Sequence, residues 1–214
     1  MPRQIKGSVH ARRAIAAQAA RLIAADGLAD YGAAKHKAAR QLGFRETDGL
    51  PDNGEIEEAL RTYQALFQNE EQRTRLMEMR RAAQAVMRDL ATYRPYLAGA
   101  TWNGTATRGA PIDIDLFTDD EKLLELSLIN RGVAFTAAQR PHFLAELQAR
   151  VPVLKMEVEG FEVRLSVFRH SDQRYALRPG AKGSVERGDA LAVADLLASD
   201  DERDRVERFL ATIR

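Results

Sequence analysis

The stretch of sequence that decides the fold is Leu97-Ala-Gly-Ala-Thr-Trp-Asn-Gly-Thr-Ala-Thr-Arg-Gly-Ala-Pro-Ile-Asp-Ile-Asp-Leu-Phe117. Apolar and acidic residues alternate over Ile112–Leu116, and this period of two predicts a half-buried strand. Because alternate residues of a strand share a face, Asp113 and Asp115 point the same way. Two carboxylates this close repel each other unless a cation lies between them, so the pair predicts a Mg²⁺ site.

The loop before this strand is rich in groups that bind phosphate. Glycine backbones can approach a phosphate closely, and hydroxyl and guanidinium groups can donate hydrogen bonds to it. The glycines are Gly99, Gly104 and Gly109, and the donors are Thr101, Thr105, Thr107 and Arg108. A metal site next to hydrogen-bond donors that bind phosphate is typical of enzymes that catalyse phosphoryl transfer.

Regular elements are also predicted on both sides of this stretch. Tyr96–Ala100 is expected to be a short strand that leads into the loop. Thr118-Asp119-Asp120-Glu121 is typical of a capping box that opens a helix. That helix would carry Leu123, Leu124 and Leu128 on its apolar face and end near Gly132.

The order of strand, glycine loop, Asp-Ile-Asp strand and capped helix resembles the DNA polymerase beta-like nucleotidyltransferase superfamily. The resemblance covers about residues 96–131 and extends loosely to residue 168. The signature of this superfamily is Gly-Ser after a first strand, then about ten residues, then two acids separated by a hydrophobic residue. Gly99 takes the place of the signature glycine, and Gly104-Thr105-Ala106 matches the small residues that often follow it. Ala100 stands where the superfamily has its phosphate-binding Ser, so Thr101 or Thr105 would substitute for it.

The resemblance implies an enzyme that moves a nucleotidyl group from a nucleoside triphosphate to an acceptor hydroxyl. Asp113 and Asp115 would hold Mg²⁺ or Mn²⁺, which joins the nucleotide to the paired acids. Phosphate positioning would fall to Gly99, Thr101, Gly104, Thr105 and Arg108. A third carboxylate on a neighbouring strand would act as general base, and either Glu162 or Glu157 could fill this place, with Glu162 as the choice.

The segment after Pro152 predicts a tight hairpin, because two alternating runs flank Glu159-Gly160. If these two residues form the turn, Glu157 pairs with Glu162, and Lys155 pairs with Arg164 on the same face. The opposite face is then apolar throughout, with Leu154, Met156, Val158, Phe161, Val163, Leu165 and Val167.

Residues 1–92 are predicted to be helical and residues 93–214 to be mixed. Two N-terminal helices are expected, over Ala11–Ala25 with a stop at Gly27 and from Asp30 through Arg40. A capping box at Asp52 and Glu55 opens a third helix, and a fourth begins near Glu70. The apolar faces of the third and fourth helices are Ile56, Leu60, Tyr63 and Phe67, and Leu76, Met79, Ala83, Val86 and Leu90. Asp189 and Ser199 could each cap a short C-terminal helix.

These predictions add up to an α+β protein. Its N-terminal helical region would pack on a small mixed-sheet, nucleotidyltransferase-like core.

The charge of the chain is uneven although its net charge is only +1. Residues 1–45 hold nine bases and two acids, a net of +7, and the remaining residues hold 23 bases and 29 acids, a net of −6. A basic arm favours a polyanion such as RNA or DNA as a partner. The alternative function is therefore a non-catalytic nucleic-acid-binding or regulatory protein. Residues 16–28 also resemble the helical start of tetracycline-repressor-type regulators, with Lys35–Gly43 as the groove-binding helix.

The composition excludes several other classes of function. The chain has 214 residues and no cysteine, so disulfides, thiolate metal sites and thiol nucleophiles are absent. No apolar run approaches the length of a membrane span, and Arg12 and Arg13 interrupt the start of the chain where a signal peptide would be apolar. A cytoplasmic location is expected. The four histidines lie far apart in sequence and are read as surface or structural residues.

Overall fold

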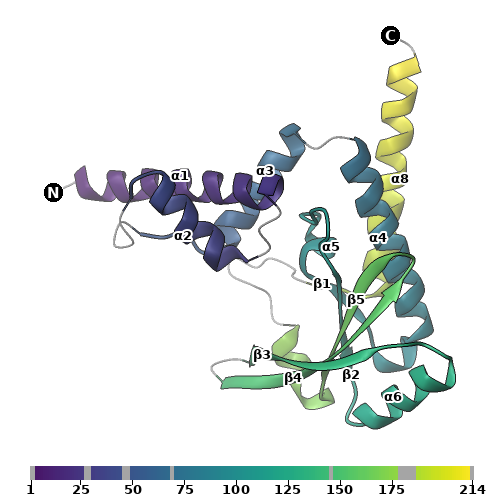
Figure 1. The fold of residues 1–214 in the computed structure, drawn as a ribbon. Helices are drawn as coiled ribbons and strands as arrows, with labels where there is room; N and C mark the ends of the chain where they lie inside the picture. The colour runs from purple at the N-terminus through teal and green to yellow at the C-terminus, as the bar shows by residue number, and fades with distance from the viewer. Residues whose placement is uncertain are drawn as a thin grey trace. The chain divides into compact units, whose positions relative to one another are not determined.

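A computed structural model describes residues 3–26, 30–44, 49–67, 70–144, 147–177 and 187–212 (Figure 1). The fold class is α+β, as predicted. Contacts divide the chain into two compact units, which are described separately. The first unit comprises Met1–Arg73 together with Thr107–Ala110, and the second comprises Thr74–Ala106 together with Pro111–Arg214.

The first unit is built from three helices, α1 (Arg3–Asp26), α2 (Tyr31–Gln41) and α3 (Asn53–Phe67). Its core is made mostly of alanine and aliphatic side chains, which allow the three helices to approach one another closely. The predicted starts of α2 and α3 are confirmed, whereas α1 begins at Arg3 and not at the predicted Ala11. Asp30 Oδ1 accepts hydrogen bonds from the amides of Gly32 and Ala33, and Asp52 and Glu55 form a reciprocal capping box with both bonds at 2.8 Å. The predicted stop at Gly27 lies outside the described residues.

The second unit begins within α4 (Glu70–Asp89), so its boundary falls at Arg73 and not at the predicted change near residue 92. The physical reason is the apolar stripe of α4, which is buried in the second unit at Met79, Ala83 and Val86. The helix therefore shares a core with the sheet that follows it in the chain.

A six-stranded mixed sheet forms the centre of the second unit, in the order β3-β4-β5-β2-β1-β6. The strands are β1 (Tyr96–Ala98), β2 (Ile112–Phe117), β3 (Thr136–Leu144), β4 (Leu147–Val158), β5 (Phe161–Phe168) and β6 (Arg187–Gly188). The β2–β5 pair is parallel and all other pairs are antiparallel. Strand β3 was not predicted, and it covers the outer edge of the β4–β5 hairpin.

The predicted hairpin is confirmed in its register. Glu157 pairs with Glu162 and Lys155 pairs with Arg164. Glu159 and Gly160 have φ of 52° and 80°, which is the left-handed pair that a two-residue hairpin turn requires. The apolar face of the hairpin lies in the core, because every second residue points to the same side of the sheet.

The prediction of a half-buried strand at Ile112–Leu116 is wrong for one face. Strand β2 lies inside the sheet, and five of its six residues are buried, Asp115 among them. Beyond Asp115, the same face is closed by Phe117 and Phe168, whose rings stack with centroids 5.6 Å apart. Alternation alone does not show whether a face is covered, and the two arginines that contact Asp115, Arg140 and Arg187, lie elsewhere in the sequence.

Three helix predictions need correction. Strand β1 ends at Ala98 and not at the predicted Ala100, and Gly99–Asn103 forms the one-turn helix α5, where the end of the strand and the start of a loop were expected. Helix α6 (Glu121–Asn130) is capped by Asp120, which accepts from the Leu123 amide at 2.9 Å, whereas Thr118 was the predicted cap. The side chain of Leu123 is 56% exposed, so it does not belong to the core.

The C-terminal helix α8 (Ala190–Thr212) is continuous and is capped by Asp189, as predicted. Ser199 lies within this helix and donates to the Asp195 carbonyl, so it begins no second helix. Helices α4 and α8 lie side by side beside the sheet (Figure 1). The short elements are η2 (Ala91–Tyr93), η3 (His170–Asp172) and α7 (Gln173–Ala176).

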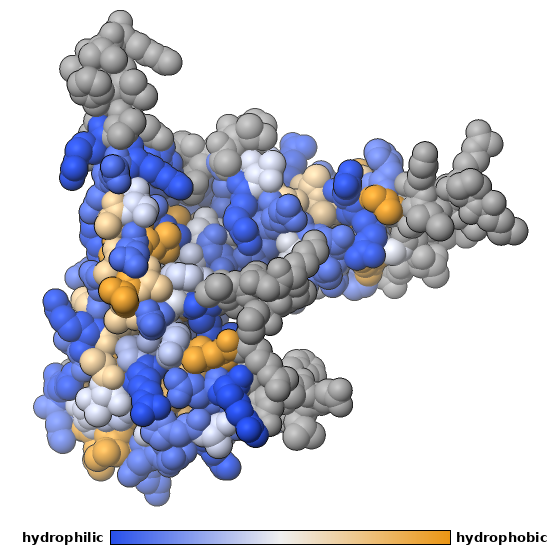
Figure 2. Space-filling model, turned by 180° about the vertical axis from the view of Figure 1, so that it is seen from behind, coloured by the Kyte–Doolittle hydropathy of each residue, from blue (hydrophilic) through white to orange (hydrophobic). Residues whose placement is uncertain are grey.

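The surface seen in Figure 2 is mainly hydrophilic, with hydrophobic residues in small separate patches. No helix within the described ranges is both long enough and apolar enough to cross a membrane.

Candidate active site

The two predicted acids lie on one face of β2, at the centre of the sheet. Asp113 pairs with Ala98 of β1 and with Arg164 of β5, while Asp115 pairs with Tyr96 and with Ser166. The sequence alternation therefore placed both carboxylates correctly relative to each other.

Asp115 is fully buried and is held by two guanidinium groups. Arg187 Nε donates to Asp115 Oδ2 at 2.5 Å, and Arg140 Nη2 lies 3.6 Å from Asp115 Oδ1. These arginines come from β6 and β3, the two opposite edges of the sheet. A buried carboxylate needs such partners, because an isolated charge is costly in the protein interior.

Asp113 is partly buried, and burial is the largest cause that raises the pKa of its carboxyl group above the ordinary value of 3.8. Arg140 and Arg164 oppose this rise, whereas the neighbouring negative charges of Asp115 and Glu162 add to it. The negative charge of Asp115 therefore disfavours the charged form of Asp113, and a cation near Asp113 would relieve this repulsion.

Gly99 lies directly against the Asp113 carboxylate. Its φ is +62°, a conformation that L side chains rarely adopt, and a Cβ atom at this position would meet Asp113 Oδ2 at 2.9 Å. Glycine is thus required here for two reasons, backbone conformation and close approach. The structure brings together the predicted signature glycine and the first acid of the pair.

The predicted hydroxyl donors point into the protein. Thr101 and Thr105 are 0% and 2% exposed, and Thr101 Oγ1 donates to the Pro111 carbonyl at 3.4 Å. Gly104 ends α5 with φ of +78° and lies against the guanidinium of Arg80. Thr101 and Thr105 are therefore buried, and Gly104 is half-buried at the end of α5.

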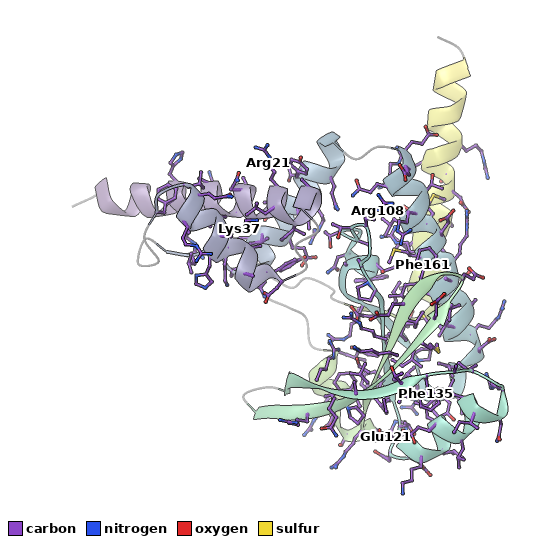
Figure 3. All side chains as sticks on the ribbon, in the orientation of Figure 1. Arg21, Lys37, Arg108, Glu121, Phe135 and Phe161 are labelled. Carbon is purple, nitrogen blue, oxygen red and sulfur yellow. The ribbon has the colours of Figure 1, made fainter. Side chains whose placement is uncertain are left out.

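Two further candidates lie elsewhere. Arg108, which is labelled in Figure 3, is exposed. It belongs to Thr107–Ala110, which is assigned to the first unit. Trp102, which could have stacked on a base, is packed against β6, because a Cβ atom on Gly188 would meet its ring at 2.1 Å.

The candidate third acids lie on the hairpin, on the same face as the aspartates. Glu162 is exposed on β5, two residues before Arg164, whose Nε donates to Glu162 Oε1 at 2.5 Å. Glu157 of β4 is the cross-strand partner of Glu162. Of the two, Glu162 is on the strand next to β2 and contributes to the raised pKa of Asp113.

Sequence reasoning did not find Arg140, Arg187 or Ser166. Ser166 and Asp115 are register partners and both are fully buried. Arg140 lies on a strand that was not predicted, and Arg187 follows a segment without any alternation. The only available signal was indirect: a buried acid pair on a central strand requires cations from elsewhere in the chain.

A comparison with protein-family models and a comparison with curated proteins both find no match to this chain. The functional argument therefore rests on the residues themselves.

Proposed function

We propose that the second unit is a nucleotidyltransferase that uses Mg²⁺ or Mn²⁺ and a nucleoside triphosphate. The observation that carries this proposal is the position of Asp113 and Asp115 on one face of a central strand, with the backbone of Gly99 against the first carboxylate. Paired acids beside a closely approaching glycine backbone suit a metal–phosphate complex. We place the reaction in the cytoplasm, where triphosphates and Mg²⁺ are abundant.

The residues present fit a divalent cation. Asp115 Oδ1 is buried and has no hydrogen-bond partner among the described residues, and the Asp113 carboxylate is next to it on the strand. The described part of the chain contains no group of three or more His, Cys, Asp or Glu residues that could hold a metal. The support for Mg²⁺ is the carboxylate pair itself, because in a nucleotide site this ion commonly takes one or two carboxylates and completes its shell with phosphates and water.

When bound, the cation would neutralise charge on the phosphates during transfer. Glu162 would accept the proton of the acceptor hydroxyl as its oxygen attacks the α-phosphorus. The new bond joins the acceptor oxygen to this phosphorus, the bond to the bridging oxygen of the β-phosphate breaks, and pyrophosphate leaves. Arg164 Nε donates a hydrogen bond to Glu162 Oε1 at 2.5 Å and so restrains this carboxylate.

The test is calorimetric titration of ATP, GTP, CTP and UTP with and without Mg²⁺. It compares the wild type with the Asp113→Asn/Asp115→Asn variant. We expect metal-dependent binding in the wild type and at least a tenfold loss in this variant. The matched control is Asp195→Asn/Glu202→Gln, which removes two exposed carboxylates of α8 and should bind like the wild type.

The single variant Asp113→Asn covers the case in which loss of the Asp115 charge prevents folding, because Asp113 is partly exposed. Unchanged binding in a folded Asp113→Asn protein would overturn the proposal. Failure of the folded wild type to bind any of the four triphosphates would overturn it as well.

The alternative, nucleic-acid binding by the basic arm, is favoured by the exposure of Arg13, Arg21 and Arg40 on α1 and α2. Arg21 is labelled in Figure 3. Arg12, in contrast, is paired with Glu55 at 2.9 Å. Since α1 is part of the core of its unit, deletion of residues 1–45 would unfold that unit. Replacing the three exposed arginines by Gln is the better test, and it should abolish salt-sensitive, Mg²⁺-independent binding of RNA or DNA.

A further inference from the structure

Two arginine side chains, one from each edge of the sheet, form ion pairs with the Asp115 carboxylate. Arg187 reaches it from β6 and Arg140 reaches it from β3, and these strands are the two ends of the sheet order. In the proposed reaction Asp115 binds a divalent cation. Two guanidinium groups on the same carboxylate repel such a cation, so the arrangement described here opposes metal binding in the absence of substrate.

The arrangement also leaves three buried polar atoms without a hydrogen-bond partner among the described residues. Asp115 Oδ1, Ser166 Oγ and Arg140 Nε are buried and make no hydrogen bond within the described residues. Buried polar groups of native proteins are nearly always hydrogen-bonded, and each exception needs an explanation. One ligand can satisfy this set if it offers both acceptor oxygens, for Arg140 Nε and Ser166 Oγ, and a cation, for Asp115 Oδ1. A metal-bound triphosphate has this chemistry.

The arginines are also suitable for phosphate in their own right. A guanidinium presents a planar fork of N–H donors that matches phosphate oxygens, and it is always charged. The side chain of Arg140 is 41% exposed and that of Arg187 is 13% exposed, so each is in reach of solvent while it touches a buried acid. The hydroxyls of Thr101 and Thr105, by comparison, are buried.

We infer that Arg140 and Arg187 bind the phosphates of the substrate and that, without substrate, both pair with the Asp115 carboxylate. The divalent cation therefore binds together with the triphosphate and not before it. This inference rests on the proposed function. A triphosphate carries several negative charges and competes with one carboxylate for both guanidinium groups. The transfer of both guanidinium groups to the phosphates removes two positive charges from the Asp115 carboxylate, which can then bind the cation.

The experiment uses the full chain, with Mg²⁺ alone, inorganic tripolyphosphate alone, and the two together as calorimetric probes. The variants are Arg140→Gln and Arg187→Gln. The matched control is Arg150→Gln, which removes an exposed arginine of β4 whose place in the strand alternation puts it on the opposite face of the sheet. For the wild type and the control, we expect tripolyphosphate to bind and Mg²⁺ alone to bind at least tenfold more weakly than in the presence of tripolyphosphate.

Each Arg→Gln variant is expected to bind tripolyphosphate at least tenfold more weakly and Mg²⁺ alone at least tenfold more tightly than the wild type. The opposite signs of these two changes separate this inference from a loss of fold, which would weaken both. Arg187→Lys keeps the positive charge at this position but lacks the planar fork of N–H donors. It should therefore weaken tripolyphosphate binding without strengthening Mg²⁺ binding. If Arg187→Gln does not fold, Arg140→Gln carries the test, because its side chain is the more exposed.

Two results would overturn the inference: tripolyphosphate binding that is unchanged in both variants, or wild-type binding of Mg²⁺ alone that equals binding in the presence of tripolyphosphate. Failure of the proposed function is distinguishable from both. It appears as arginine-dependent tripolyphosphate binding that neither Mg²⁺ nor Asp113→Asn affects, which would leave an anion site without transferase chemistry.

Discussion

Replacement of Arg80 by Met is predicted to destabilise the second unit strongly. Arg80 lies on α4 with a side chain only 6% exposed, and it forms an ion pair with Asp200 of α8. It also donates to two carbonyl oxygens of α5, those of Thr101 at 3.1 Å and Trp102 at 3.2 Å. One guanidinium thus connects α4, α8 and the short helix that follows β1.

The magnitude follows from what the substitution leaves behind. Removing one member of a buried ion pair costs about 3–5 kcal/mol, because the other charge stays buried without its partner. Hydrogen bonds from a charged donor contribute about 1.5–3 kcal/mol each, but they share the same group and do not add to the first figure in full. Asp200 is 17% exposed, so water partly replaces the lost partner. We expect a loss of about 3–4 kcal/mol.

The assay is urea unfolding followed by the fluorescence of Trp102, the single tryptophan of the chain, whose carbonyl accepts from Arg80. With a typical urea dependence of about 2 kcal/mol per molar, the midpoint should fall by about 1.5–2 M. Arg81→Met is the matched control, because Arg81 pairs with Asp201 on the same two helices while the two side chains are 54% and 48% exposed. Exposed pairs contribute about 0–1 kcal/mol, so its midpoint should move by less than about 0.5 M.

A midpoint for Arg80→Met within about 0.5 M of that for Arg81→Met would refute the reasoning, since burial would then make no difference between the two pairs. Asp200→Asn provides a second reading if Arg80→Met does not fold. It removes the ion pair but leaves both carbonyl hydrogen bonds in place, so it should cost less than Arg80→Met. An equal or larger cost would show that the carbonyl bonds to α5 contribute nothing.

Three further predictions concern single positions in or near the site. Gly99→Ala should lower the free energy of unfolding by about 2–3 kcal/mol, through both backbone strain and contact with Asp113, whereas Gly132→Ala, with a similar φ and open space around it, should cost only about 1 kcal/mol. Because folding raises the pKa of Asp113 above 3.8, the folded state holds this proton more tightly, and stability is lost as pH rises from that value through the folded pKa. Asp113→Asn should therefore raise the urea midpoint at pH 7 and lose this advantage near pH 4; an equal advantage at both values would contradict the sign. Gly188→Ala should cost about 1–3 kcal/mol and shift the emission of Trp102, since a Cβ atom would enter the space of its ring.

Much of the local structure could be predicted from the sequence. The capping box at Asp52 and Glu55, the turn at Glu159-Gly160 and the shared face of the two aspartates depend on residues within four positions of one another. Backbone geometry alone then fixes which side chains meet. The structure confirms all three of these local features.

Local patterns were misread where the outcome depended on burial. Leu123 fits the apolar stripe of α6 but is exposed, and Ser199 fits a helix start but lies inside α8. In each case the residue type is compatible with both environments, and packing elsewhere in the unit decides between them.

The sequence by itself determined the shared face of the two aspartates and the hairpin that carries Glu162, because these follow from strand alternation and from a turn. Gly99 was singled out as a loop glycine and by the family resemblance. Only the tertiary structure decided what surrounds Asp115. Arg187 lies 72 positions away and reaches it from one edge of the sheet, while Arg140 reaches it from the other. The alternation of β2 does not show whether a face of the strand is covered, and side chains from distant parts of the chain contact Asp115. A buried carboxylate requires such cationic partners, and our proposal that the site takes phosphates as well as a metal rests on them.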